Sequence, residues 1–152
     1  MIKFKNSVII KRPLPDVFAF VSNFENLPKW NYYVTEVDKL TEGPVGEGTT
    51  YHQTRKTDEQ DIQVVEFDHN RLVAIKTLPP ERPLQMRFQF EPIDGGTRIT
   101  DEWKLEAGVP GPFAWLATRK VKSAVSENLT KLKALLEMGH VTLQNGREVN
   151  YR

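Results

Sequence analysis

The sequence predicts an α+β domain in which a meandering antiparallel β-sheet packs against one long C-terminal α-helix. Three observations support this prediction. Strand-length runs separated by turn residues fill the chain from residue 34 to residue 106. Within them, residues 84–106 alternate between apolar and polar positions, as a β-hairpin does. From Gly111 to Met138 the apolar period changes from two residues to about 3.6, which is typical of a helix.

The chain opens with a strand that stops at a pair of prolines, and a short helix follows. Pro15 suits the first helical turn, where its missing N–H costs nothing, and Asp16 favours the positive end of the helix dipole. A second short helix is expected to end at Pro28 and Trp30. The first helix buries one apolar face, made of Val17, Phe20 and Val21.

The middle of the chain contains four predicted strands, each bounded by turn residues: 34–40, 48–56, 61–68 and 72–78. The prolines between residues 79 and 83 predict a loop, because proline cannot donate a ladder hydrogen bond. The clearest alternation follows this loop. The turn Asp94-Gly95-Gly96 joins its two strands into an antiparallel hairpin.

The long helix at residues 111–138 carries an apolar stripe that is expected to face the sheet. Pro112 suits its first turn, and Gly139 ends it. The stripe consists of Phe113, Leu116, Ala117, Val121, Val125, Leu129, Leu132 and Leu136. We therefore predict one domain over residues 1–139, followed by a polar tail at 140–152 that frays.

Residues 13–30 resemble the START/polyketide cyclase-like superfamily (SRPBCC), which has the Bet v 1-like helix-grip fold. Members open with a strand, then Pro-x-x-x-Val-Phe-x-Phe, then Asn-Leu-Pro-x-Trp. The matching residues are Pro13, Val17, Phe18, Phe20, Leu27, Pro28 and Trp30. The resemblance covers roughly residues 2–138 and implies a curved antiparallel sheet wrapped around the long helix, with two short helices after the first strand. It defines a diverse superfamily rather than one activity.

Composition restricts the functional classes. A chain of 152 residues is the size of one ordinary domain, and 21 Lys and Arg against 20 Asp and Glu give no electrostatic argument for nucleic acid. No cysteine is present, which excludes a disulfide framework and a thiol nucleophile. No apolar run approaches the length needed for stable membrane insertion. We expect a soluble, cytoplasmic protein.

The hairpin suggests the wall of a cavity. Its apolar face is expected to point inward and consists of Met86, Phe88, Phe90, Ile99 and Trp103. Asp101 shares this face with Ile99 and Trp103, where an unpaired charge is costly and a partner or water is expected. Asp101 is either a structural carboxylate paired with a neighbour or an anchor for a ligand.

Three further regions are candidates for the cavity. The strand at 48–56 is polar on both faces, so periodicity does not orient it; the resemblance implies that Tyr51, Gln53 and Arg55 point inward. The alternative is a twisted strand that exposes both faces. The resemblance also places Trp30 near one wall, although core packing is the simpler role. Phe113 follows a Gly/Pro bend at residues 108–112, from which it could gate the pocket or cap the helix.

These features predict a protein that binds a small hydrophobic or amphipathic molecule, such as a lipid, a polyketide-like compound or an aromatic, without a cofactor. One alternative is an aromatase/cyclase or dehydratase, in which Asp101 with Tyr51, His52 or Arg55 supplies general acid–base chemistry. Another is a protein-interaction module that presents the long helix or an open sheet edge. The three histidines lie far apart, with no metal-ligand spacing, so no metal site is predicted. Nothing in the sequence specifies an oligomeric state.

Overall fold

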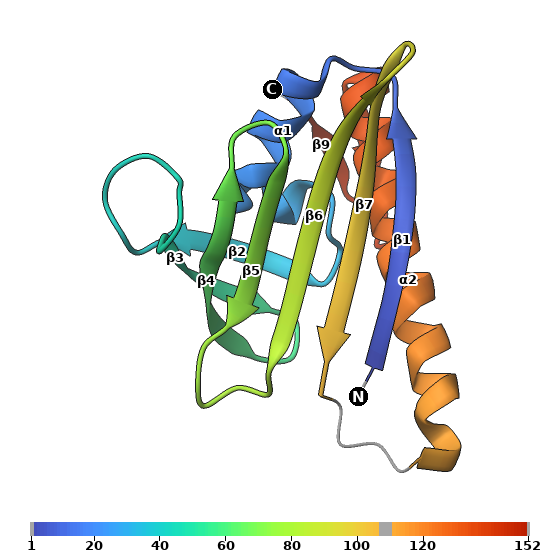
Figure 1. Cartoon of the computed structure of the whole chain (residues 1–152). Coiled ribbons are helices and arrows are strands. Elements are labelled where there is room, and N and C mark those ends of the chain that lie inside the picture. Colours follow the sequence, from blue (N-terminus) through green and yellow to red (C-terminus); the bar gives the residue numbers. More distant parts are fainter. Residues whose placement is uncertain (1, 107–110, 152) are drawn as a thin grey trace.

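The computed structural model describes residues 2–106 and 111–151, so part of the bend predicted at 108–112 lies outside the described residues. The first short helix, α1, is followed by a 3₁₀ helix, η1, and the long helix is α2 (Figure 1). The elements are β1 (Ile2–Ile10), α1 (Leu14–Ser22), η1 (Phe24–Lys29), β2 (Val34–Lys39), β3 (Thr50–Arg55), β4 (Glu59–Asp68), β5 (Leu72–Thr77), β6 (Leu84–Ile93), β7 (Gly96–Leu105), α2 (Gly111–Met138), β8 (His140–Thr142) and β9 (Glu148–Asn150).

Within the described residues, seven strands form one curved antiparallel sheet in the order β1-β7-β6-β5-β4-β3-β2. The first strand therefore lies beside the last one, and the strands between them follow as a meander. Helix α2 packs along β1. Helix α1 contacts the sheet at β6, and η1 contacts it at β2. This arrangement confirms the predicted helix-grip architecture, including the two short helices after the first strand.

The β6–β7 hairpin has the predicted phase. Met86 pairs with Trp103, Phe88 with Asp101 and Phe90 with Ile99, so the apolar positions of both strands share the inner face. The hairpin turns at Gly95, whose φ of 80° is a left-handed conformation that glycine adopts without strain. Gly96 is required for a different reason, because the carbonyl oxygen of Ile10 occupies the space that a Cβ would need.

The apolar stripe of α2 divides into three intervals. Its C-terminal turns close the main core, in which Leu129, Leu132 and Leu135 are buried against the sheet. Its middle turns, residues 120–128, face a cavity. Its first turns extend past the ends of β1 and β7 (Figure 1), and the predicted stripe residues Phe113 and Leu116 are exposed there. A helix longer than the sheet it covers leaves its overhanging apolar residues without a partner.

The prediction that the tail frays is wrong. Strands β8 and β9 form an antiparallel hairpin, with Val141 8% exposed and Leu143 3% exposed. The Lys131 ammonium group donates to the Thr142 carbonyl at 2.9 Å, and the Arg147 guanidinium donates to the Pro28 carbonyl at 2.7 Å. Tyr151 packs against Phe20 of α1. Two buried apolar side chains and long-range hydrogen bonds therefore hold this polar segment.

Candidate ligand-binding cavity

A cavity of about 560 Å³ lies between the inner face of the sheet and the middle turns of α2. It is within the range typical of small-molecule sites. Strand alternation builds its sheet side, since every second residue of each strand points to this face. The apolar side chains on its wall are Leu27, Val34, Ile62, Ile75, Leu84, Met86, Trp103, Leu105, Val121, Ala124 and Val125.

Buried polar groups interrupt the apolar wall. Gln53 on β3 and Gln60 on β4 are cross-strand partners and both line the cavity, while Asn128 reaches it from α2. Gln53 is 5% exposed, and its Oε1 has no hydrogen-bond partner among the described residues. A buried acceptor without a donor costs about 1–3 kcal/mol. A hydroxyl or N–H group of a ligand would satisfy it.

Thr77 is another buried polar residue of the cavity wall, and its hydroxyl already has hydrogen-bond partners within the protein. Its hydroxyl donates to the Arg82 carbonyl at 2.9 Å and accepts from the Leu84 amide at 3.0 Å. These bonds tie the loop after β5 to the start of β6 and leave Thr77 no need of a ligand. Gln53 is therefore the stronger candidate for polar recognition.

Charged side chains gather at the rim of the cavity. Arg55 lies beside Asp58, with Nε 3.2 Å from Oδ1, and both side chains are partly exposed. Lys76, Glu81, Arg82 and Lys120 are the other charged residues of the lining. The rim is polar and the interior mostly apolar, so the cavity suits an amphipathic molecule better than a fully charged one.

Asp101 is buried beside the cavity, but it is not on the wall. Its Oδ2 accepts a hydrogen bond of 3.0 Å from the Trp103 indole, and Trp103 does line the cavity. Oδ1 has no partner among the described residues. Burial raises the pKa of Asp101 to about 7, and the bond from Trp103 partly opposes that rise. Asp101 therefore orients a wall residue.

Five predicted cavity residues belong to the packed core instead. Phe88 contacts both Phe24 and Trp30, with ring centroids 6.2 and 6.4 Å away. Phe90 packs on Phe18 of α1 at 5.0 Å. Trp30, Tyr51, Phe88, Phe90 and Ile99 are all at most 4% exposed. Alternation placed the three hairpin residues on the inner face, and the resemblance placed Tyr51 and Trp30 near the cavity. Phe18 of α1 and Phe24 of η1 pack on that part of the face and fill it.

Tyr51 does point inward, as the resemblance implied for its strand. Its hydroxyl lies near the Phe24 backbone but makes no hydrogen bond of normal geometry with a described residue. Burial, the largest effect, raises the pKa of Tyr51 to about 12. The phenol is therefore neutral at physiological pH and faces the core.

Phe113 does not line the cavity. Its side chain is 59% exposed in the overhanging first turns of α2. The sequence stripe extended to Phe113 because helical periodicity continues there, whereas the sheet beneath it ends.

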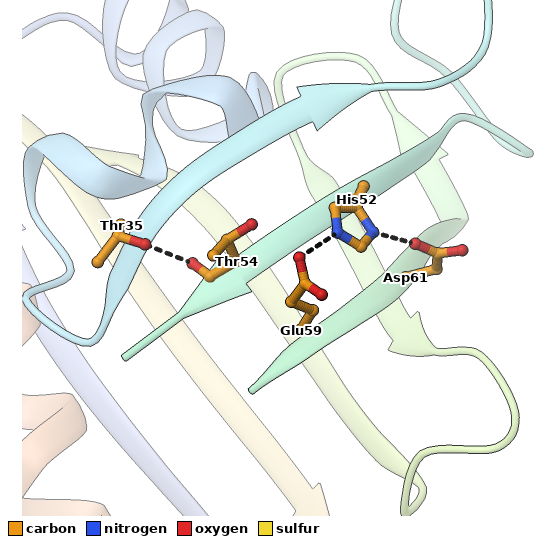
Figure 2. Close-up of polar contacts among 5 residues, drawn as sticks. All are labelled: Thr35, His52, Thr54, Glu59 and Asp61. Atoms are coloured by element: carbon orange, nitrogen blue, oxygen red, sulfur yellow. Dashed lines mark hydrogen bonds and ion pairs between the residues drawn. The ribbon is translucent and has the colours of Figure 1, made fainter. Parts of the chain in front are cut away.

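His52 lies on the opposite face of β3 from Tyr51 and Gln53, so it cannot act on a molecule in the cavity. Figure 2 shows its ring between two carboxylates of β4. Nδ1 is 2.7 Å from an oxygen of Asp61, and Nε2 is 3.3 Å from one of Glu59. The hydrogen bonds to Asp61 and then Glu59 raise the pKa of His52. The expectation that His52 supplies acid–base chemistry in the cavity is wrong.

Four of the predicted residues do meet at the cavity: Gln53, Arg55, Met86 and Trp103. Sequence reasoning did not select the lining residues of β4, β5 and the middle of α2. A signal for them exists. Ile62 and Ile75 have the inward phase of their strands, and Val121, Val125 and Asn128 recur at helical spacing. What the sequence does not show is where inward residues stop packing and begin to enclose space.

No helix in the described part of the chain is long and apolar enough to cross a membrane. Across residues 2–106 and 111–151, no group of three or more His, Cys, Asp or Glu residues is arranged to hold a metal ion.

A curved sheet that grips a long C-terminal helix around an open cavity defines a START-like helix-grip protein. The chain belongs to the family described as "Polyketide cyclase / dehydrase and lipid transport", whose model matches residues 1–137. This confirms the resemblance found at residues 13–30. No curated protein sequence matches the chain.

Solved structures show the same fold at low identity. A START superfamily protein from Mycobacterium smegmatis aligns with a TM-score of 0.71 and 14% identity, over 90% of this chain and 97% of that one. The Aha1 dimer from Colwellia psychrerythraea gives 0.69 and 19%, over 91% and 98%. The di-domain ARO/CYC BexL of the BE-7585A biosynthetic pathway gives 0.68 and 17%, over 88% of this chain and 45% of that one.

Proposed function

We propose that this protein binds a small amphipathic molecule, largely apolar but carrying a hydrogen-bond donor, in the cavity between the sheet and α2. The observation that carries the proposal is an apolar cavity of about 560 Å³ with the unpartnered, buried Oε1 of Gln53 on its wall. An apolar wall supplies most of the affinity of such sites, and a few fixed polar groups orient the ligand. The family's lipid-transport and polyketide functions are consistent with molecules of this kind.

Filling the cavity should abolish binding without unfolding the protein. Ala124 lines the cavity from α2 and is half-buried, so Ala124→Trp places an indole into existing space. We expect affinity for the apolar fluorescent probe 1-N-phenylnaphthylamine to fall at least about tenfold, because the added ring takes the space of the probe. Fluorescence titration measures the affinity.

Ser126→Trp is the matched control, since Ser126 lies exposed on the outer side of the same helix. It should bind the probe like the wild type. A wild type that gives no fluorescence gain, or an Ala124→Trp variant that binds equally well, would refute the cavity proposal. If the wild type binds the probe and Ala124→Trp does not, native mass spectrometry of co-purifying molecules would identify the natural ligand.

Gln53→Leu tests the polar half of the proposal. Leucine keeps a similar size but removes the acceptor, so affinity for 1-naphthol should fall about fivefold, the loss of one ordinary hydrogen bond. Affinity for 1-methylnaphthalene, which has no donor, should stay equal or rise. Calorimetry or competition with the fluorescent probe measures both. Equal losses for the two compounds would mean that Gln53 acts by shape alone.

A cyclase or dehydratase reaction is the second candidate, and Asp101 is the observation that favours it. A buried carboxyl with a free oxygen and a pKa near neutrality has the properties of a general acid or base. Asp101 does not line the cavity whereas its hydrogen-bond partner Trp103 does, so the carboxyl would reach a ligand only after the wall rearranges. Once a ligand is identified, an Asp101→Asn variant that binds but no longer turns it over would favour catalysis; unchanged turnover would exclude Asp101.

A further inference from the structure

The first turns of α2 expose a cluster of large apolar side chains. Phe113 is 59% exposed, Trp115 60% and Leu116 48%. They lie within four consecutive residues on turns that extend past the ends of β1 and β7 (Figure 1). Burial of such side chains is normally favourable, so a cluster of this kind marks a contact surface.

The turns that follow carry only positive charge. Arg119, Lys120 and Lys122 are the charged residues between positions 111 and 126, and no acidic residue occurs in that interval. None of the three forms an ion pair with a described residue. On the neighbouring sheet, Lys3 is the register partner of Lys104, and Glu106 is the exposed acid closest to them in sequence. Glu102 pairs with Lys104 at 4.0 Å and with Lys5 at 3.4 Å on that sheet edge, so the unpaired positive charge beside the apolar cluster is that of Arg119, Lys120 and Lys122.

We propose that this end of α2 docks the protein on the surface of an anionic lipid bilayer. The docking surface consists of Phe113, Trp115 and Leu116 together with Arg119, Lys120 and Lys122. Apolar side chains of a helix enter the boundary between headgroups and acyl chains, and adjacent Lys and Arg residues pair with anionic headgroups. Tryptophan favours this boundary because its ring is both apolar and polar.

The position of the surface fits a role beside the cavity. Lys120 belongs both to the docking surface and to the cavity rim, and Val121 and Ala124 of the next turns line the interior. A protein resting on a bilayer through these turns would hold the cavity entrance close to the lipid phase. Docking needs no ligand in the cavity, so the vesicle-binding experiments test it independently of the proposed ligand-binding function.

Trp115 provides the measurement. It is the exposed member of the chain's three tryptophans, since Trp30 is buried and Trp103 half-buried. Adding equimolar phosphatidylcholine–phosphatidylglycerol vesicles to the wild-type protein should shift the emission to shorter wavelength and protect it from acrylamide. Phosphatidylcholine vesicles should give a much smaller effect, and high salt should reduce binding to the anionic ones.

Two variants separate the apolar and the charged contributions in vesicle co-flotation. The triple variant Phe113→Ser, Trp115→Ser, Leu116→Ser should lose at least about tenfold in partitioning. The double variant Arg119→Gln, Lys122→Gln should lose about fivefold per charge on anionic vesicles and change little on phosphatidylcholine. Met138→Ser, which alters a 66% exposed residue at the other end of α2, is the matched control and should bind normally.

The altered side chains are exposed, so the far-ultraviolet circular dichroism and thermal unfolding of all variants should match the wild type. Failure of the wild type to bind anionic vesicles would overturn the proposal, as would a triple variant that binds as tightly. A wild type that sediments as a dimer and a triple variant that sediments as a monomer would instead assign the surface to self-association. Ala124→Trp should leave vesicle binding unchanged.

Discussion

The Asp101→Asn variant should gain stability over the wild type as pH rises. The difference between their unfolding free energies should be up to about 4 kcal/mol larger at pH 8 than at pH 4. Burial raises the pKa of Asp101 from 3.8 to about 7 in the folded state. Below pH 4 both states hold the proton, and the group costs nothing. Between pH 4 and pH 7 the unfolded chain loses its proton while the folded chain retains it, so the wild type loses stability as pH rises. Above pH 7 the penalty is constant.

The Asn variant carries no such proton, although its amide oxygen can still accept the hydrogen bond from Trp103. Urea unfolding of both proteins at a series of pH values gives the difference between them, in which the titration of all other groups cancels. Asp94→Asn, which removes a carboxyl at an exposed turn position, is the control substitution. Parallel curves for wild type and Asp101→Asn would show that Asp101 ionises normally in the folded protein.

Trp30→Ala should cost about 3–5 kcal/mol, as truncations of large core residues do. The sequence predicted that Trp30 is buried, and this is confirmed: its side chain is 4% exposed and packs edge-on against Phe88. Chemical denaturation followed by circular dichroism measures the loss.

Trp115→Ala is the control for this experiment, because the same side chain is removed from a 60% exposed position. It should change stability by no more than about 0.5 kcal/mol. A cost below about 1 kcal/mol for Trp30→Ala would show that the core closes around the gap or that Trp30 is not part of it.

The sequence predicted most of the fold because local signals agreed with tertiary structure. The β6–β7 hairpin shows this best: its alternation is unbroken, its turn contains two glycines, and the observed pairing has the predicted phase. Gly139 ended α2 as predicted, with φ at 83° and its amide bonded to the Leu135 carbonyl. Each signal acts over a few residues, so each could be recognised without the rest of the molecule.

The cavity was harder to predict, since it depends on how far apart two layers lie. Phe88 and Met86 have the same inward phase on the same strand, yet Phe88 meets Trp30 while Met86 lines open space. In β3 the polar sequence did not indicate which face is buried, because both faces carry polar residues; Gln53 is nevertheless buried. The C-terminal hairpin was not predicted because each of its strands has only three residues. Its buried apolar residues are Val141 and Leu143, too few to form a recognisable pattern in the sequence.

The succession of intervals along α2 has a consequence for how such a chain can vary. Residues 120–128 line the cavity, and Val125 among them also packs on Ile2 and Phe4 of β1. Residues 129–136 close the main core, while Phe113, Trp115 and Leu116 of the first turns are exposed. Substitutions at the cavity positions that are not also core positions, such as Ala124, therefore leave the main core intact. Substitutions in one or two turns of α2 can change the size or polarity of the cavity, while the turns that follow maintain the stability of the fold. Proteins of this architecture can therefore evolve to bind different ligands without a change of fold.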